Sequence, residues 1–246
     1  MKSIFLHYGN KTRYTIRYYN ERNSMFDKRI NIFTGHFGSG KTEVAVNYAV
    51  RLSEIVPKTA IVDLDIVNPY FRTADAKNEL ESNNIWVVTP LYANTNVDVP
   101  ALPPELNALS EKKEYNVVLD VGGDDLGARV LSRYREEILR DNYEMFFVIN
   151  TKRPMTDTFE KIEQMISEVE GSSRLKVTKL VNNTNLLGQT SIDDIIMGHE
   201  LIRSISDKLN IPVSFISGFR DLIEGIEQRL DTNVLYLEKM IKLPWE

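Results

Sequence analysis

Residues 30–52 read INIFTGHFGSGKTEVAVNYAVRL, in which a short apolar strand, a glycine-rich loop and an amphipathic helix follow one another directly. The loop glycines Gly35, Gly38 and Gly40 have no Cβ, so the backbone N–H groups around them and Ser39 can turn inward. These donors, together with the positive end of the following helix, suit phosphate oxygens. The stretch therefore predicts a phosphate-binding loop (P-loop).

Two side chains at the end of the loop extend this interpretation. Lys41 can reach terminal phosphates, and the hydroxyl of Thr42 can bind Mg²⁺. Beyond them, Val44, Tyr48 and Leu52 recur at helical spacing, as expected for an amphipathic helix that packs on a sheet. The pattern thus predicts a strand, a loop and a helix that together bind a nucleotide.

The composition narrows the class of protein. The chain has 246 residues, of which 42% are hydrophobic and 26% charged, as in ordinary globular proteins. A net charge of −5 argues against broad nucleic-acid or anionic-membrane binding. The absence of cysteine excludes disulfides, thiolate zinc sites and iron–sulfur ligation. No apolar run is long enough to span a bilayer, and we expect a cytoplasmic protein.

Apolar strands alternate with amphipathic helices along the chain. This alternation predicts an α/β fold with a doubly wound, mostly parallel sheet flanked by helices, as in P-loop NTPases. We expect one nucleotide-binding domain over 25–246, after an N-terminal extension (1–24) that is either a hairpin or disordered. The expected strands are 30–34, 59–65, 85–89, 116–121, 144–150, 175–182 and 211–216. The expected helices are 41–55, 72–83, 104–113, 127–140, 155–170, 191–209 and 221–241, with starts at Thr156 and Ser191 for the fifth and sixth.

Carboxylates follow two of the predicted strands. Asp63 and Asp65 end the second strand, and Asp120 ends the fourth, just before Gly122-Gly123. In a parallel sheet, ligands bind beyond the carboxyl ends of the strands. Because Mg²⁺ prefers oxygen ligands and neutralises a triphosphate, we expect Asp120 to bind it directly or through water. Asp65 is expected to position the attacking water or to bind Mg²⁺ through water.

This order of motifs resembles the MinD/ParA/Mrp-like (SIMIBI) class of P-loop ATPases. The resemblance implies Mg²⁺-ATP binding, slow hydrolysis and often an ATP-dependent, face-to-face homodimer. It matches Lys41 and Thr42 to the phosphate-loop pair, and Asp65 and Asp120 to the two switch aspartates. Many of these ATPases carry a second lysine directly after the first loop glycine, where this chain has His36. Histidine carries less positive charge at neutral pH, so dimer-dependent hydrolysis stays open.

The expected base is adenine. The resemblance matches Asn182 to an asparagine that contacts adenine. The loop also resembles that of the nickel-insertion GTPases, which read guanine with Asn-Lys-x-Asp. Residues 182–185 read NNTN, and an amide cannot accept two hydrogen bonds as a carboxylate fork does. ATP is therefore favoured over GTP.

Several functions fit this scaffold. The first is a slow ATPase that acts as a nucleotide switch for an unidentified partner protein. The second is a small-molecule kinase or ATP-dependent ligase of the dethiobiotin-synthetase-like type, whose acceptor pocket Asp124-Asp125 and the proline-punctuated loop 90–104 would shape. Metallochaperone-type GTPases and regulators without catalysis are further alternatives. The apolar stripe in 234–243 indicates either core packing of a last helix or, less favoured, a membrane-surface helix.

Overall fold

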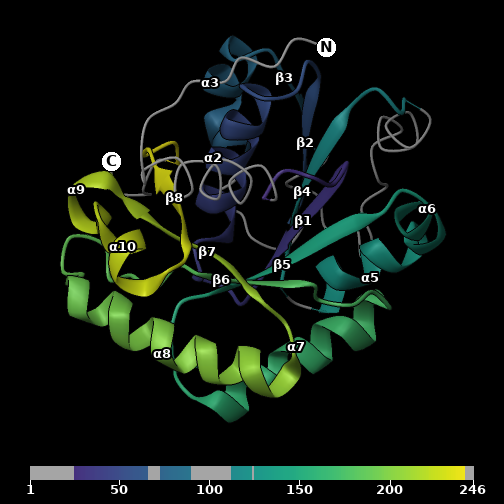
Figure 1. Cartoon of the computed structure of the whole chain (residues 1–246). Coiled ribbons are helices and arrows are strands. Elements are labelled where there is room, and N and C mark those ends of the chain that lie inside the picture. Colours follow the sequence, from purple (N-terminus) through teal and green to yellow (C-terminus); the bar gives the residue numbers. More distant parts are fainter. Residues whose placement is uncertain (1–24, 66–72, 90–111, 124, 242–246) are drawn as a thin grey trace, which may run out of the picture.

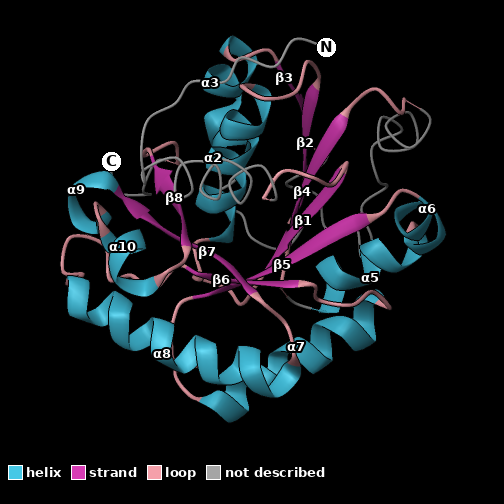
Figure 2. Cartoon of the chain, viewed as in Figure 1, coloured by secondary structure: helices cyan, strands magenta, loops and turns pink. Residues whose placement is uncertain are grey.

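The computed structural model describes residues 25–65, 73–89, 112–123 and 125–241, which form an eight-stranded parallel sheet flanked by helices (Figures 1 and 2). All seven strand pairs are parallel, and the strand order is β3-β2-β4-β1-β5-β6-β7-β8. The strands are β1 (Ile30–Thr34), β2 (Thr59–Leu64), β3 (Ile85–Val88), β4 (Asn116–Val121), β5 (Tyr143–Ile149), β6 (Lys179–Asn182), β7 (Val213–Phe219) and β8 (Asn233–Leu237). The predicted fold class is confirmed.

Strand β1, which leads into the P-loop, lies in the middle of the sheet. It pairs with β4 on one side and with β5 on the other. Strands β2, β3 and β4 lie on one side of β1, and β5 to β8 lie on the other. The direction in which strands are added to the sheet therefore reverses next to β1. In an open parallel sheet, such a reversal opens a crevice at the carboxyl ends of the strands, where ligands bind.

Helices cover both faces of the sheet. Neighbouring residues of a strand point to opposite faces, so Ile32 packs under α5–α8 while Phe33 packs under α2. In Figure 1, α2 and α3 lie on one side of the sheet, and α7 and α8 run across the other. The helices are α2 (Lys41–Ser53), the 3₁₀ helix η1 (Thr73–Ala76), α3 (Lys77–Ser82), α5 (Asp125–Arg133), α6 (Arg135–Arg140), α7 (Phe159–Ser173), α8 (Ile192–Leu209), α9 (Arg220–Ile223) and α10 (Ile226–Leu230).

An aromatic cluster fixes α2 against the sheet. The fully buried Tyr48 ring lies 4.9 Å from that of Phe33 and 5.5 Å from that of Phe146, and these two rings stack at 4.7 Å. The Tyr48 hydroxyl donates a 2.9 Å hydrogen bond to Asn31 Oδ1 on β1. Helix α2 is thereby anchored to the strand that precedes the P-loop, which holds both ends of the loop in place.

The predicted helix over 221–241 is wrong. Two short helices, α9 and α10, are followed by β8, which pairs in parallel with β7. Gly225 (φ 83°) and Asp231 (φ 46°) have left-handed backbones that flank α10 and end helical structure there. Leu235 and Leu237 in β8, and Ile241 after it, are buried with the α2 core, so the described part of the apolar stripe is core packing. Across the described ranges, no helix has both the length and the apolarity needed to cross a bilayer.

The other differences are smaller. The predicted strand 175–182 is regular only over 179–182, and the predicted helix 127–140 is divided into α5 and α6 at Tyr134. Thr158 caps α7 instead of Thr156, whose hydroxyl donates to Asn150 O within a turn. Ser191 caps α8 with a full capping box, as expected. The extension 1–24, the loop 90–104 and all but the last two residues of the predicted helix 104–113 lie outside the described residues; those two are not helical.

Candidate functional site

The loop between β1 and α2 has the backbone that phosphate binding requires. Gly35, Gly38 and Gly40 have φ values of 154°, 79° and 80°, which side chains disfavour. A Cβ on Gly35 would lie 2.4 Å from the carbonyl oxygen of Val148. The N-cap of α2 is Gly40, which has no side chain with which to cap the first turn. The N-cap residue therefore offers the first N–H groups of α2 no side-chain acceptor at the place where an anion would sit.

The predicted catalytic side chains meet at this loop. Lys41 Nζ donates a 2.5 Å hydrogen bond to Asp65 Oδ2 beyond the end of β2, and both side chains are buried. At the end of β4, Asp120 Oδ2 accepts a 3.1 Å hydrogen bond from the hydroxyl of Thr73, and the side chain of Thr42 lies close enough to lower the pKa of this carboxyl. The structure thus brings Lys41, Thr42, Asp65 and Asp120 together.

Burial shifts the ionisation of this cluster. Desolvation raises the pKa of Asp120 to about 6, the charge of Lys41 opposes the shift, and the charge of Asp65 adds to it. Desolvation alone would lower the pKa of Lys41, but Asp120, Asp65 and Asp63 together outweigh it, so the pKa of Lys41 is raised. The ammonium of Lys41 thus interacts with all three carboxylates of this buried cluster.

The oxygen atoms of Thr42 and Asp120 fit a magnesium ion. Asp120 Oδ1 is buried and has no hydrogen-bond partner among the described residues, so this carboxylate has an acceptor site to fill. A hydroxyl and a carboxylate are the hard oxygen donors that Mg²⁺ prefers. No group of three or more acidic, histidine or cysteine side chains in the described ranges could hold a metal alone. Such a shortfall is normal for Mg²⁺, which takes its other ligands from phosphates and water.

The end of β4 touches the P-loop directly. A Cβ added to Gly123 would lie 1.9 Å from the carbonyl oxygen of Gly35 and 3.1 Å from the backbone nitrogen of His36. Only glycine permits this approach. The carboxyl end of β4 also approaches α5 closely, because a Cβ on Gly127 would lie 2.6 Å from Gly122 O.

A cavity of about 890 Å³ opens beside the P-loop. Lys41 and Thr42 line it, while Asp65 and Asp120 lie behind them in contact with these two side chains. Loops after β5, β6 and β7 and the end of β8 form the other walls, to which Asn183, Phe219 and Leu237 contribute. The volume falls within the range of small-molecule binding sites.

Asn183, rather than Asn182, faces this cavity. Asn182 is fully buried: its amide nitrogen donates to Ile195 O at 3.1 Å, and its amide oxygen accepts from Thr184 N at 3.0 Å. Asn183 lines the cavity and donates to Ser39 O in the P-loop at 2.7 Å. Side chains alternate along a strand, so neighbouring residues point to different sides. The sequence alone did not show which of the two asparagines points to the cavity.

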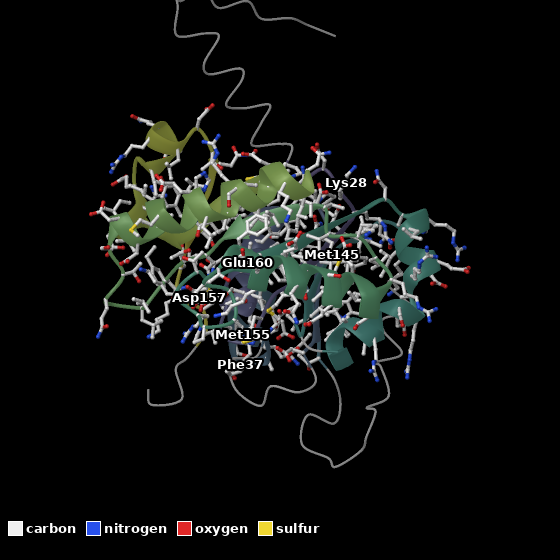
Figure 3. All side chains as sticks on the ribbon, turned by 90° about the horizontal axis from the view of Figure 1, so that it is seen from below. Lys28, Phe37, Met145, Met155, Asp157 and Glu160 are labelled. Carbon is white, nitrogen blue, oxygen red and sulfur yellow. The ribbon has the colours of Figure 1, made fainter. Side chains whose placement is uncertain are left out.

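Two residues to which sequence reasoning gave no firm role also border the cavity. His36 lines it, and so does Arg153, whose Nε donates a 3.0 Å hydrogen bond to Gly38 O. The neighbouring side chains of Phe37 and Met155 are exposed and lie along one edge of the molecule (Figure 3). The Asn68–Arg72 segment and Asp124 lie outside the described residues.

Comparison with known proteins shows similarity only among solved structures. No protein-family model and no curated protein matches the sequence. Chloroplast FtsY from Physcomitrella patens has 19% identity and a TM-score of 0.48, over 76% of this chain and 57% of that one. FtsY from Elizabethkingia anophelis in complex with GDP has 18% identity and a TM-score of 0.48, over 76% and 56%. A nucleotide-binding protein from Archaeoglobus fulgidus in complex with ADP has 15% identity and a TM-score of 0.42, over 86% and 88%.

The chain spans less than two thirds of the length of either FtsY chain. The fold assignment therefore rests on the strand order and the P-loop backbone of this structure itself.

Proposed function

We propose that this protein is a cytoplasmic, Mg²⁺-dependent ATP-binding protein with slow ATPase activity that acts as a nucleotide switch for a partner protein. The observation that carries the proposal is the convergence of Lys41, Thr42, Asp65 and Asp120 behind a glycine loop at one end of the cavity. Each of these side chains has a defined task in triphosphate chemistry.

Thr42 and Asp120 would hold Mg²⁺, which, when bound, neutralises phosphate charge. The loop amides and Lys41 hold the phosphate oxygens, and they favour charge that develops on the terminal phosphoryl group. Asp65 accepts a hydrogen bond from the attacking water and orients it. The water oxygen bonds to the terminal phosphorus as the bond to the bridging oxygen breaks. ADP and inorganic phosphate leave, and the proton from water passes to solvent.

The contact between Gly123 and Gly35 supports a switch. A third phosphate on the loop would press on the end of β4, and Gly122 would pass the displacement to α5. A partner protein that binds near α5 would then distinguish ATP from ADP. A face-to-face homodimer stays a prediction, which sedimentation with ATP and with ADP tests.

GTP is the second candidate because Asp221 also lines the cavity. A carboxylate can accept from the guanine N1 and N2 hydrogens, whereas the amides of Asn183 and Asn185 suit either base. Competition of ATP and GTP for one labelled nucleotide, repeated with Asp221→Asn, separates these possibilities. A preference for GTP that disappears in the variant would replace ATP in the proposal.

The central test is calorimetric titration of the full chain with ATP and Mg²⁺. We expect micromolar or tighter binding, a loss of at least about tenfold in Lys41→Ala, and a loss of the Mg²⁺ dependence in Thr42→Ala. The matched control is Lys58→Ala, which changes an exposed lysine just before β2. Absence of Mg²⁺-dependent nucleotide binding in the wild-type chain, or full binding in Lys41→Ala, would contradict the proposal.

A further inference from the structure

Arg153 is held against the P-loop by the turn that follows β5. Its Nε donates a 3.0 Å hydrogen bond to Gly38 O, a carbonyl 115 residues earlier in the chain. The turn is closed by bonds from Arg153 N to Asn150 O (3.1 Å) and from Thr156 N to Arg153 O (2.9 Å). Asn150 is fully buried and accepts from Lys152 N as well. The guanidinium is therefore placed by both its backbone and its Nε, and it lines the cavity.

The P-loop leaves space for this side chain. A Cβ on Gly38 would lie 3.2 Å from Arg153 Nε and 3.5 Å from Cζ. The bond to Gly38 uses one of five guanidinium N–H donors. Within the described ranges, Arg153 makes no other side-chain hydrogen bond or ion pair. Four donors on a rigid, planar group thus remain at the rim of the cavity, in the geometry that suits phosphate.

The charges at the site favour a further cationic donor such as Arg153. Lys41 bonds to Asp65 and is attracted by Asp120 and Asp63, so its positive charge is already shared. Mg²⁺ held by Asp120 would share its charge with this carboxylate as well as with the phosphates. A further cation at the cavity would therefore stabilise an anionic polyphosphate.

The other described cations near the cavity have partners. Lys152 forms a 2.5 Å ion pair with Asp194 at the start of α8. Lys239 attracts the carboxylate of Glu43. Among the described cavity-lining cations, Arg153 alone touches the P-loop without a carboxylate partner.

We propose that Arg153 is a phosphate-binding residue that uses its Nη N–H groups to contact a phosphate oxygen of the bound nucleotide. This role rests on the proposed nucleotide-binding function and adds to it a cation supplied by the chain itself. The bond from Nε to Gly38 O pre-organises the guanidinium, so little side-chain entropy is lost on binding.

The test compares Arg153→Ala, Arg153→Lys and Arg153→Gln with the wild type, and with Lys152→Ala as the neighbouring control. Titration calorimetry with Mg²⁺-ATP, Mg²⁺-ADP and adenosine gives the Kd of each ligand, and a phosphate-release assay gives kcat. We expect Arg153→Ala to weaken ATP by about 10- to 100-fold and to leave adenosine unchanged. Arg153→Lys should retain part of the affinity, Arg153→Gln should resemble Arg153→Ala, and Lys152→Ala should stay within about twofold of wild type.

Added guanidinium ion tests whether Arg153 contributes its charge to phosphate binding or only supports the P-loop. At millimolar concentration it should restore part of the ATP affinity of Arg153→Ala and leave the wild type unchanged. If Arg153 only supported the P-loop and made no phosphate contact, the results would differ. Arg153→Gln, which can still donate to Gly38 O, would then match the wild type. In Arg153→Ala, the affinity for adenosine would fall along with that for ATP. That result, or wild-type ATP binding by Arg153→Ala, would overturn the role of Arg153 alone. A wild-type chain that binds no nucleotide would overturn this inference together with the proposed function.

Discussion

Lys41 Nζ and Asp65 Oδ2 lie 2.5 Å apart in a buried ion pair that joins the end of the P-loop to the end of β2. The backbone nitrogen of Asp65 donates to Asp63 Oδ1 at 3.0 Å, so the carboxylate that holds the lysine is itself fixed. The ammonium needed for phosphate is thus engaged within the protein. Under the proposed function, a nucleotide would have to compete with Asp65 for it, unless Mg²⁺ compensated the carboxylate.

The first prediction concerns this competition. Asp65→Asn removes the negative charge that holds Lys41, so we expect ATP without Mg²⁺ to bind several-fold more tightly. Hydrolysis should fall by at least about 100-fold, because the group that orients the water is weakened. Titration in EDTA and a phosphate-release assay measure the two effects. Glu79→Gln, on exposed α3, is the charge-matched control, and a variant with both values unchanged would remove Asp65 from the mechanism.

The second prediction concerns the dependence of stability on pH. The pKa of Asp120 is raised from 3.8 to about 6 in the fold, so between these values the folded state binds the proton more strongly. The contribution of Asp120 to the free energy of unfolding therefore falls as pH rises from about 4 to 6. Above pH 6 the cost reaches up to about 3 kcal/mol.

Asp120→Asn should remove this cost. In urea unfolding of the nucleotide-free protein, we expect the variant to be more stable than wild type at pH 7.5 and to lose that advantage near pH 4. We also expect Asp120→Asn to lose the stabilisation that Mg²⁺-ATP gives to the wild type. Equal stability differences at both pH values would show that Asp120 ionises as easily in the folded chain as in the unfolded one.

The third prediction uses two glycines. Gly123→Ala places a Cβ 1.9 Å from Gly35 O, so the P-loop must shift, and we expect nucleotide affinity to fall at least about tenfold. Gly171→Ala, in α7, meets no atom within 4 Å and should raise the free energy of unfolding by about 0.5–1 kcal/mol through helix propensity. Titration and urea unfolding of both variants test this. Unchanged binding in Gly123→Ala would argue against a fixed contact between β4 and the loop.

The fourth prediction concerns the link between α2 and the end of the described chain. Asn47 Nδ2 donates to Glu238 O at 2.9 Å and Asn47 Oδ1 accepts from Glu238 N at 2.7 Å. Asn47→Ala leaves both backbone groups without their partner, and we expect a loss of about 2–4 kcal/mol in the free energy of unfolding. Gln164→Ala, on the exposed side of α7, should change it by less than about 0.5 kcal/mol. A similar small change in Asn47→Ala would mean that water replaces these bonds.

The sequence predicted those features that local chemistry determines. The P-loop depends on glycines and on Lys41-Thr42, which are contiguous, and the parallel sheet follows from apolar strands that alternate with helices. Asp65 and Asp120 could be placed because strand ends share one edge of such a sheet. These parts needed no knowledge of distant contacts.

The remaining features depend on partners far along the chain. Leu237, Met240 and Ile241 fit a helical spacing, but residues 233–237 also fit a strand, and pairing with β7 and packing on α2 decide between them. Asn182 and Asn183 cannot be told apart without the strand register. Arg153 gained its assignment only from a bond to Gly38 across 115 residues.

The hydrogen bonds between Asn47 in α2 and Glu238 after β8 also have a consequence for the order in which the chain folds during synthesis. Asn47 meets Glu238 across 191 positions, and the cavity wall that includes Leu237, Lys239 and Ile241 depends on that closure. During translation, the P-loop emerges early, but its pocket stays incomplete until residue 241 has left the ribosome. The P-loop is therefore synthesised early, whereas this wall of the cavity can form only late in synthesis, through a long-range contact.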